Sequence, residues 1–447
     1  MLGGAAYAAV APGSDWIYYS GYHADGWHIE RIPFQPDDWF TPFPEHATFS
    51  GEVDVGRYAR TVESPEQEYD PLPTLRPTYW APAYRPGDDA GAVEVLKPGF
   101  GLSTSGQDLV GRHSYSLFGT FSPEPGGFQG GTSYSFSGLG NPILSAFANQ
   151  FLDAEGPLAA PDESGDLLYL VERERGVGLS ATLLRRRSRT FSSITLSGSH
   201  IWEQRTLLDA SLRETERFRL NRPDSRLGEG RVSFTFSNAR RYALSVSPEN
   251  GIGVFLRGRV RRELSLADSL RDVPSEDRSL REVIGRLTLY KGLRVGGFGN
   301  HVLGLRASGG VAGGPGADAY HFEVGGASGA DGPLTFVDLG QSLLLPVRGY
   351  GTARRYGRYA WSASAEYRFP IRLVNRGLGL FPLHLDWVAG TLFMDAGNAW
   401  GPELDLRGYN SPLRDPIASV GGEVIAGILP LWYETWDVRV GFAVPLE

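Results

Sequence analysis

Residues 361–369 read Trp361-Ser362-Ala363-Ser364-Ala365-Glu366-Tyr367-Arg368-Phe369, and apolar side chains alternate with polar ones along the whole stretch. Successive side chains of a β-strand point to opposite faces of the sheet. The stretch therefore predicts a strand with one apolar face and one face of Ser, Glu and Arg. Residues 436–444, Trp436-Asp437-Val438-Arg439-Val440-Gly441-Phe442-Ala443-Val444, repeat the pattern.

Similar segments recur from residue 93 to the end of the 447-residue chain, separated by turns rich in Gly, Pro, Asp and Asn. No helical periodicity persists between them, and the chain contains no run of about 18 apolar residues that would form a membrane-spanning helix. A strand that crosses a membrane in a β-barrel needs only about 10 residues of alternating polarity. A membrane protein built from strands is therefore compatible with this composition.

Soluble β-sandwiches also alternate, so a soluble β-protein is the alternative. Long strand segments, aromatic residues near strand ends and charged polar faces favour a membrane barrel. One example of a charged face is residues 254–261, where Arg257, Arg259 and Arg261 share one side. We predict a transmembrane antiparallel β-barrel over residues 93–447, of the sixteen-strand type. The segments number about fifteen, and single-chain barrels use even numbers, so we expect a last, closing strand to be absent from this chain.

The first 92 residues differ from the rest of the chain. Residues 15–20 and 27–32 predict two short strands joined by an Asp25-Gly26 hairpin turn. The stretch resembles one blade of a TolB-like β-propeller, and we assign residues 1–48 to a propeller-blade-like fragment. Residues 49–92 are rich in Pro and acidic residues and predict a linker.

The first eleven residues lack the basic start of a secretory signal peptide, and glycines interrupt their short apolar stretch. We therefore expect them to form a buried strand and not a cleaved signal. Any export signal is then expected upstream of this chain.

Composition excludes several classes of function. The chain has no cysteine, which excludes disulfides, zinc-thiolate sites and a cysteine nucleophile. Its net charge of −8 makes nucleic acid a poor partner. The eight histidines show no metal-binding spacing, and no serine lies in a Gly-x-Ser-x-Gly motif. We therefore expect no metal, no cofactor and no enzymatic activity, and an enzyme on the barrel rim is the least favoured hypothesis.

Two short motifs suggest a specific site. Val347-Arg348-Gly349-Tyr350 follows a Gly-rich loop, and Phe393-Met394-Asp395-Ala396-Gly397 lies in a later strand segment. A lipid-facing carboxylate is costly, so Asp395 is expected to face the lumen. The guanidinium of Arg348 is a rigid fork suited to a carboxylate, and Gly349 permits a tight loop tip. Without further information, an arginine in water and an aspartate in a turn would be the simpler interpretation.

The order of these motifs resembles the bacterial surface antigen superfamily of outer-membrane barrels, which includes BamA-type insertases and two-partner-secretion pores. In that family a long loop carrying Val-Arg-Gly-Tyr folds into the lumen and contacts a Phe-x-Asp-x-Gly strand. The resemblance implies that Val347, Arg348, Gly349 and Tyr350 form the loop motif. It implies that Phe393, Asp395 and Gly397 form the strand motif that contacts it. The matched motifs cover residues 345–447, and the family's POTRA domains have no counterpart in this sequence.

This resemblance implies a protein of the bacterial outer membrane that takes part in the insertion, assembly or secretion of proteins. Expected partners are outer-membrane lipid and, in addition, client polypeptides or periplasmic factors. The alternative is a passive pore, or a membrane anchor or scaffold for a periplasmic propeller.

Overall fold

The structure is a computed structural model of the chain. It describes the following residues: 5–10, 13–23, 26–38, 69–90, 93–159, 166–215, 224–242, 244–264, 278–317, 321–326, 345–351, 354–379, 381–404, 411–430 and 436–446. The chain divides into two compact units, Met1–Pro71 and Leu72–Glu447. Residues 49–68 and 91–92, half of the predicted linker over residues 49–92, lie outside the described residues.

The first unit contains a three-stranded antiparallel sheet in the order β1-β2-β3. Its elements are β1 (Ala5–Val10), β2 (Trp16–His23), β3 (Gly26–Pro33) and the short 3-10 helix η1 (Pro36–Asp38). The predicted pairing of the two strands is confirmed, because β2 pairs with β3 in antiparallel register. Asp25 of the predicted turn lies outside the described residues, and Gly26 is the first residue of β3. The expected burial of the N-terminal strand is wrong: Tyr7 is 86% exposed, since β1 is an edge strand of a single-layered sheet. The propeller-blade assignment stays a prediction.

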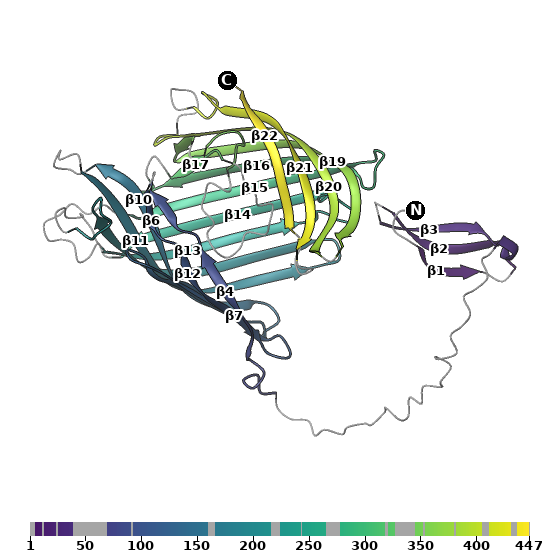
Figure 1. The fold of residues 1–447 in the computed structure, drawn as a ribbon, viewed down its shortest axis with the longest axis horizontal. Coiled ribbons are helices and arrows are strands. Elements are labelled where there is room, and N and C mark those ends of the chain that lie inside the picture. Colours follow the sequence, from purple (N-terminus) through teal and green to yellow (C-terminus); the bar gives the residue numbers. More distant parts are fainter. Residues whose placement is uncertain are drawn as a thin grey trace. The chain divides into compact units, whose positions relative to one another are not determined.

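The second unit is built on a sheet of 15 strands, in which every strand pairs with its neighbour in antiparallel register (Figure 1). The order is β22-β21-β20-β19-β16-β15-β14-β13-β12-β11-β10-β9-β8-β7-β4. The strands are β4 (Pro77–Arg85), β7 (Gly99–Gln107), β8 (His113–Ser122), β9 (Gly127–Phe136), β10 (Ile143–Ala159), β11 (Leu167–Arg186), β12 (Phe191–Leu208), β13 (Asp224–Ser237), β14 (Asn250–Glu263), β15 (Leu280–Leu293), β16 (His301–Gly313), β19 (Tyr359–Leu378), β20 (Phe381–Trp400), β21 (Ile417–Pro430) and β22 (Trp436–Leu446). The predicted all-β, antiparallel architecture is confirmed.

Among the described residues, two small two-stranded sheets lie outside this sheet. They are β5 (Asp88–Ala90) with β6 (Val93–Leu96), and β17 (Phe322–Val324) with β18 (Arg355–Gly357). The second of these sheets belongs to the long connection between β16 and β19, and residues 345–351 lie between its two strands in the sequence. Phe322 and Val324 are fully buried and cluster with Leu345 and Val347.

The predicted boundary of the barrel at residue 93 is too late. Residues 77–85, expected to be linker, form the edge strand β4 and pair with β7. The two prolines of β4, Pro77 and Pro82, argue against a strand when the sequence is considered alone. An edge strand tolerates proline, because one row of its backbone groups needs no partner in the sheet.

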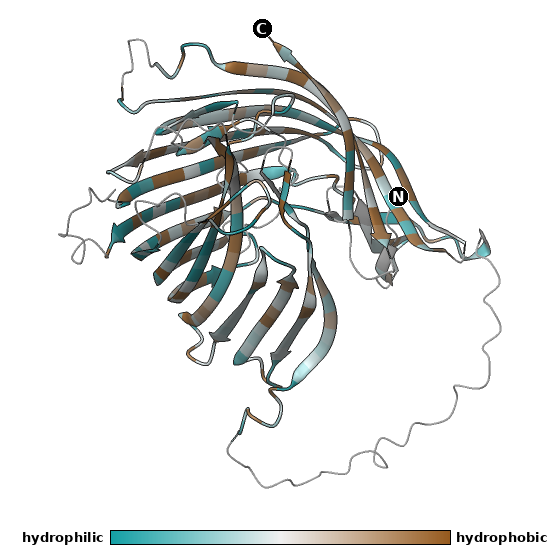
Figure 2. Cartoon of the chain, turned by 60° about the vertical axis from the view of Figure 1, so that its left-hand side comes forward, coloured by the Kyte–Doolittle hydropathy of each residue, from teal (hydrophilic) through white to brown (hydrophobic). Residues whose placement is uncertain are grey.

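Hydrophobic and hydrophilic residues alternate along many strands, as the brown and teal bands show (Figure 2). Because successive side chains of a strand point to opposite faces, the two faces of the sheet differ in polarity. On β22, Trp436, Val440 and Phe442 are 56, 72 and 70% exposed. On the opposite, inner face, charged residues such as Glu229, Glu282 and Asp395 are buried. An apolar face directed outward and a charged face directed inward are typical of strands in a membrane barrel. In the part of the chain that the structure describes, no helix is long and apolar enough to cross a membrane.

Candidate functional site

The site is built where the connection between β16 and β19 meets the inner face of β19, β20 and β21. Leu345 and Val347 are fully buried in an apolar cluster on this face. The other members of the cluster are Leu280, Ile284, Ala312, Ala317, Phe322, Val324, Ala360, Ala399 and Ile417. Burial of these side chains fixes the segment against the sheet and brings the next residue, Arg348, over β20.

Arg348 and Asp395 form a two-pronged ion pair. Nε of Arg348 donates to Oδ2 of Asp395 at 2.7 Å, and Nη2 donates to Oδ1 at 2.8 Å. The backbone N–H of Arg348 also donates to Oδ2, at 3.1 Å. The Asp395 side chain is fully buried and that of Arg348 is 9% exposed. A bidentate pair of this kind is stronger than a single neutral hydrogen bond and fixes the relative orientation of the two groups.

Two further carboxylates surround the same guanidinium. Nη2 of Arg348 donates to Glu366 Oε1 at 2.8 Å, and Nη1 donates to Glu423 Oε1 at 3.2 Å. Ser364 accepts a hydrogen bond from Nη2 at 3.1 Å. Arg348 thus joins β19, β20 and β21 through one side chain. Arg368 supplies a second cation, with its Nη2 2.6 Å from Glu366 Oε2.

Phe393 lies under the guanidinium, with the Cζ atom of Arg348 3.5 Å from the ring centroid. A cation over an aromatic face is attracted by the electron density of the ring. Gly421 faces Phe393 across the β20–β21 pair. A Cβ at Gly421 would lie 2.5 Å from Cζ of Phe393 and would clash with the backbone oxygen of Phe442. The absence of a side chain at residue 421 therefore makes room for the ring.

The glycines of the two motifs allow the loop to approach the sheet. A Cβ at Gly397 would lie 2.9 Å from the Val347 and Val324 side chains and from the Trp361 backbone oxygen. Gly349 has a φ of +88°, and a Cβ there would lie 2.9 Å from Cβ of Ala443 on β22. Left-handed backbone of this kind favours glycine.

Tyr350 extends the site to the edge strand. Its hydroxyl donates to the backbone oxygen of Ala418 on β21 at 2.9 Å, and that of Leu446 on β22 lies at 3.4 Å. The seven residues expected to form the site are Val347, Arg348, Gly349, Tyr350, Phe393, Asp395 and Gly397. The structure brings all seven together on the inner face of β19–β22.

Sequence reasoning missed Glu366, Ser364 and Glu423 as contacts of Arg348. Glu366 and Ser364 lie on the polar face of the alternating stretch 361–369, so their direction was predictable but their partner was not. Glu423 is the acidic residue of an apolar, Gly-rich strand, β21. A single carboxylate in such a strand was the one sequence feature that could have indicated a buried partner for a cation.

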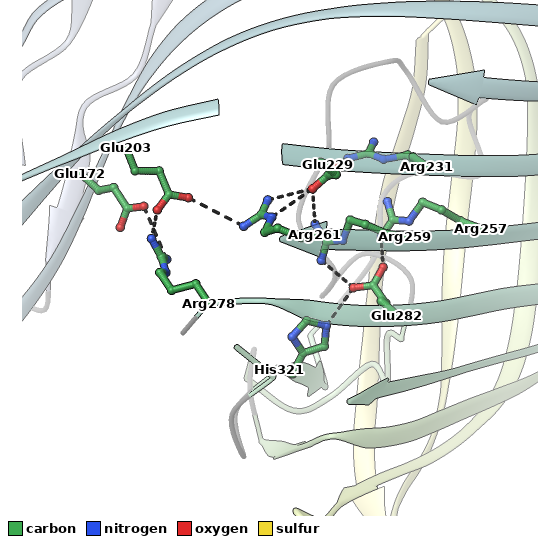
Figure 3. A network of polar contacts seen from close by, with 10 residues as sticks. All are labelled: Glu172, Glu203, Glu229, Arg231, Arg257, Arg259, Arg261, Arg278, Glu282 and His321. Carbon is green, nitrogen blue, oxygen red and sulfur yellow. Dashed lines mark hydrogen bonds and ion pairs between the residues drawn. The ribbon is translucent and has the colours of Figure 1, made fainter. Parts of the chain in front are cut away.

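A second polar network covers the inner face of β11–β15 (Figure 3). Glu282 of β15 lies 3.1 Å from Arg257, 2.7 Å from Arg259 and 2.8 Å from Nε2 of His321. Glu229 of β13 pairs with Arg231, Arg261 and, at 3.8 Å, Arg259. Glu203 and Glu172 continue the chain of contacts through Arg278.

This network also reaches the connection between β16 and β19, because His321 directly precedes β17. The connection is thus held at two places, by Arg348 against β19–β21 and by His321 against β15. Arg257, Arg259 and Arg261 share the face that their alternation predicted. Among the described residues, no group of three or more His, Asp or Glu side chains is arranged to hold a metal ion.

The long antiparallel strands, the apolar outer face and the charged inner face define the second unit as a β-barrel sheet of the bacterial outer-membrane type. The sequence matches no protein-family model and no curated protein. Among solved structures, the chain is similar to BamA from Haemophilus ducreyi lacking POTRA domains 1-3, with 12% identity and a TM-score of 0.44 over 83% of this chain and 71% of that one. It is also similar to CdiB from Acinetobacter baumannii, with 14% identity and a TM-score of 0.43 over 82% of this chain and 59% of that one.

Proposed function

We propose that this chain is an outer-membrane barrel that inserts, assembles or secretes polypeptides. In this proposal the connection between β16 and β19 is fixed in the lumen by Arg348. The observation that supports it most directly is the position of Arg348, which binds three carboxylates on β19, β20 and β21. The same segment contacts β22 through Gly349 and Tyr350.

β22 and β4 are the two edges of the sheet among the described strands. An edge strand presents unpaired backbone N–H and C=O groups, to which an extended polypeptide can add as a further strand. A segment that contacts β22 from inside, and is itself held by an ion pair, can stabilise the edge in one position. In the proposed mechanism the Arg348 site holds the β22 edge in the conformation that accepts a client strand.

The test is the folding of a client. The full chain is reconstituted into lipid vesicles, and the folding rate of an unfolded outer-membrane barrel protein is followed by its heat-modifiable gel migration. We expect folding to be faster with the wild-type chain than in empty vesicles. We expect the Arg348→Ala variant to lose most of that acceleration.

Release of a secreted polypeptide from loaded vesicles is the parallel readout for secretion. If neither readout differs between chain-containing and empty vesicles, the proposal is wrong and a passive pore or anchor is left. If the wild-type chain is active and Arg348→Ala is equally active, the barrel handles polypeptides without help from this site.

A further inference from the structure

The turn between β13 and β14 lies against the inner face of β20 and β21. The structure describes residues 238–242 and 244–249 of this turn. Val246 is 9% exposed and packs in a cluster with Trp387, Ala389 and Ile425. In the sheet, β15, β16 and β19 lie between β14 and β20. The turn therefore crosses the interior of the curved sheet instead of remaining next to the strands it joins.

Polar contacts hold the turn in this position. Glu249 is fully buried. Its Oε1 accepts a hydrogen bond from the Ser245 hydroxyl at 2.5 Å, and its Oε2 accepts one from Nδ2 of Asn300 at 2.8 Å. The turn between β15 and β16 lies close to the β13–β14 turn. A Cβ at Gly299 would lie only 2.5 Å from the backbone oxygen of Leu244. A buried carboxylate is costly unless it is hydrogen-bonded, so these contacts specify one arrangement of the two turns.

Little space remains beneath Val246. A cavity of about 20 Å³ lies there, lined also by Glu366, Arg368, Trp387 and Thr391. That is room for about one water molecule. The Arg348 site lies further along the same strand: Ala389 and Asp395 are six residues apart on β20, which is about 20 Å. The inner face of β20 is thus covered at both places, by segments that arrive from opposite ends of the strands.

We propose that the β13–β14 turn is a plug that closes one end of the lumen and must leave the inner face of β20 and β21 before a polar solute or a polypeptide can pass there. The proposal rests on the proposed membrane-barrel function and extends it. Glu249 is the residue that keeps the plug in place, through Ser245 and Asn300. Val246 seals the contact with the wall.

The test uses the absence of native cysteines. Thr391, which is 2% exposed beneath the plug, is replaced as Thr391→Cys in the full chain in detergent. The rate of labelling by a charged methanethiosulfonate reagent is measured with the wild-type turn, with Glu249→Ala and with Val246→Ser. We expect each turn substitution to increase the rate roughly tenfold, because lost hydrogen bonds or packing favour the open turn.

Two controls are matched to this test. Ser116→Cys places an exposed reporter on β8, and its labelling rate should be the same in every background. Arg189→Ala changes an exposed residue of the β11–β12 turn and should leave the labelling of Thr391→Cys unchanged. The heat-modifiable compact band is recorded for each variant, so that only folded protein is compared.

An unchanged labelling rate in folded Glu249→Ala and Val246→Ser proteins would overturn the plug. The milder Val246→Ser variant keeps the test decisive if Glu249→Ala does not fold. The plug and the proposed transport can fail separately. If the turn variants label faster but the wild-type chain shows no client folding or secretion, the plug is supported and the proposed polypeptide transport is wrong.

Discussion

At the scale of single residues, Arg348 organises the inner face because one guanidinium satisfies several acceptors at once. Asp395 is fully buried, and Glu366 and Glu423 are nearly so. Three carboxylates this close would repel one another without a cation between them. The ring of Phe393 completes the environment by covering one face of the guanidinium. Undocking the loop would remove this cation and leave Arg368 as an ion-pair partner of Glu366.

The first prediction concerns the charge and shape of this side chain. Arg348→Ala should destabilise the folded barrel by about 3–5 kcal/mol, because it leaves buried carboxylates without their partner. Arg348→Lys should recover only part of that loss, since lysine keeps the charge but cannot form the bidentate contact or the flat stack on Phe393. Denaturant unfolding in detergent, followed by gel migration, measures both. Equal stability of the alanine variant and the wild type would contradict the assignment.

The second prediction concerns Gly397. Gly397→Ala should cost about 1–3 kcal/mol, because its methyl group would press against Val347 and Val324 and displace the loop. The matched control is Gly230→Ala on β13, where a Cβ would meet nothing within 4 Å. Both changes add one methyl group to a strand glycine, so the difference between their unfolding midpoints isolates crowding at the loop. The prediction fails if the two variants lose the same stability.

At the scale of elements, alternation of polarity decides which face of each strand is buried. It correctly placed Arg257, Arg259 and Arg261 together, and it gave the apolar face of β22. The alternation could not identify β4. Pro77 and Pro82 are compatible with a strand only at the edge of a sheet, and the sequence alone does not show which strand is an edge. It also could not show that Val246 is buried. A turn sequence reports where the chain reverses, whereas burial of Val246 depends on β20 and β21, which are more than 100 residues away in the chain.

The pairing of Arg348 with Glu423 was unpredictable for the same reason. Charge and strand period limited the direction of each side chain, but the approach of the loop is set by Gly349, Gly397 and Gly421 acting together. Two of these three glycines belonged to recognisable motifs. Gly421 did not, and its role follows only from the register that places it opposite Phe393.

The third prediction tests which face of β16 meets lipid. Leu305 is 52% exposed near the middle of this strand. Leu305→Arg should cost about 2–4 kcal/mol in a lipid bilayer, because a cation would face hydrocarbon near the membrane centre. Leu305→Phe, which keeps the position apolar, is the control and should retain nearly full stability. Unfolding is measured in vesicles. A tolerated arginine would indicate that this face is in water, as in a soluble β-protein.

At the scale of the whole molecule, the second unit owes its order to one continuous sheet and to the segments that fold onto its inner face. The connection between β16 and β19 enters from one end of the strands, and the β13–β14 turn enters from the other. Both reach β19–β21, at Asp395 and at Ala389. These two segments cover the inner face of β19–β21 with buried side chains, while the outer face is apolar and exposed.

The last prediction follows from the division of the chain into two units. The 15-stranded sheet takes all its strands from residues 72–447, and the strands of residues 1–71 form a separate sheet. Among the described residues, the strands of the large sheet pair only with one another, and no strand of the first unit joins them. Deleting residues 1–71 should therefore leave the heat-sensitive compact band and the strand-rich circular dichroism spectrum in detergent intact. The midpoint of the gel shift with temperature should agree with that of the full chain. Loss of the compact band on deletion, with the band present in the full chain, would mean that the first unit is required for the barrel sheet to form. It would also restrict the propeller-like fragment to a role in assembly of this sheet instead of an independent module.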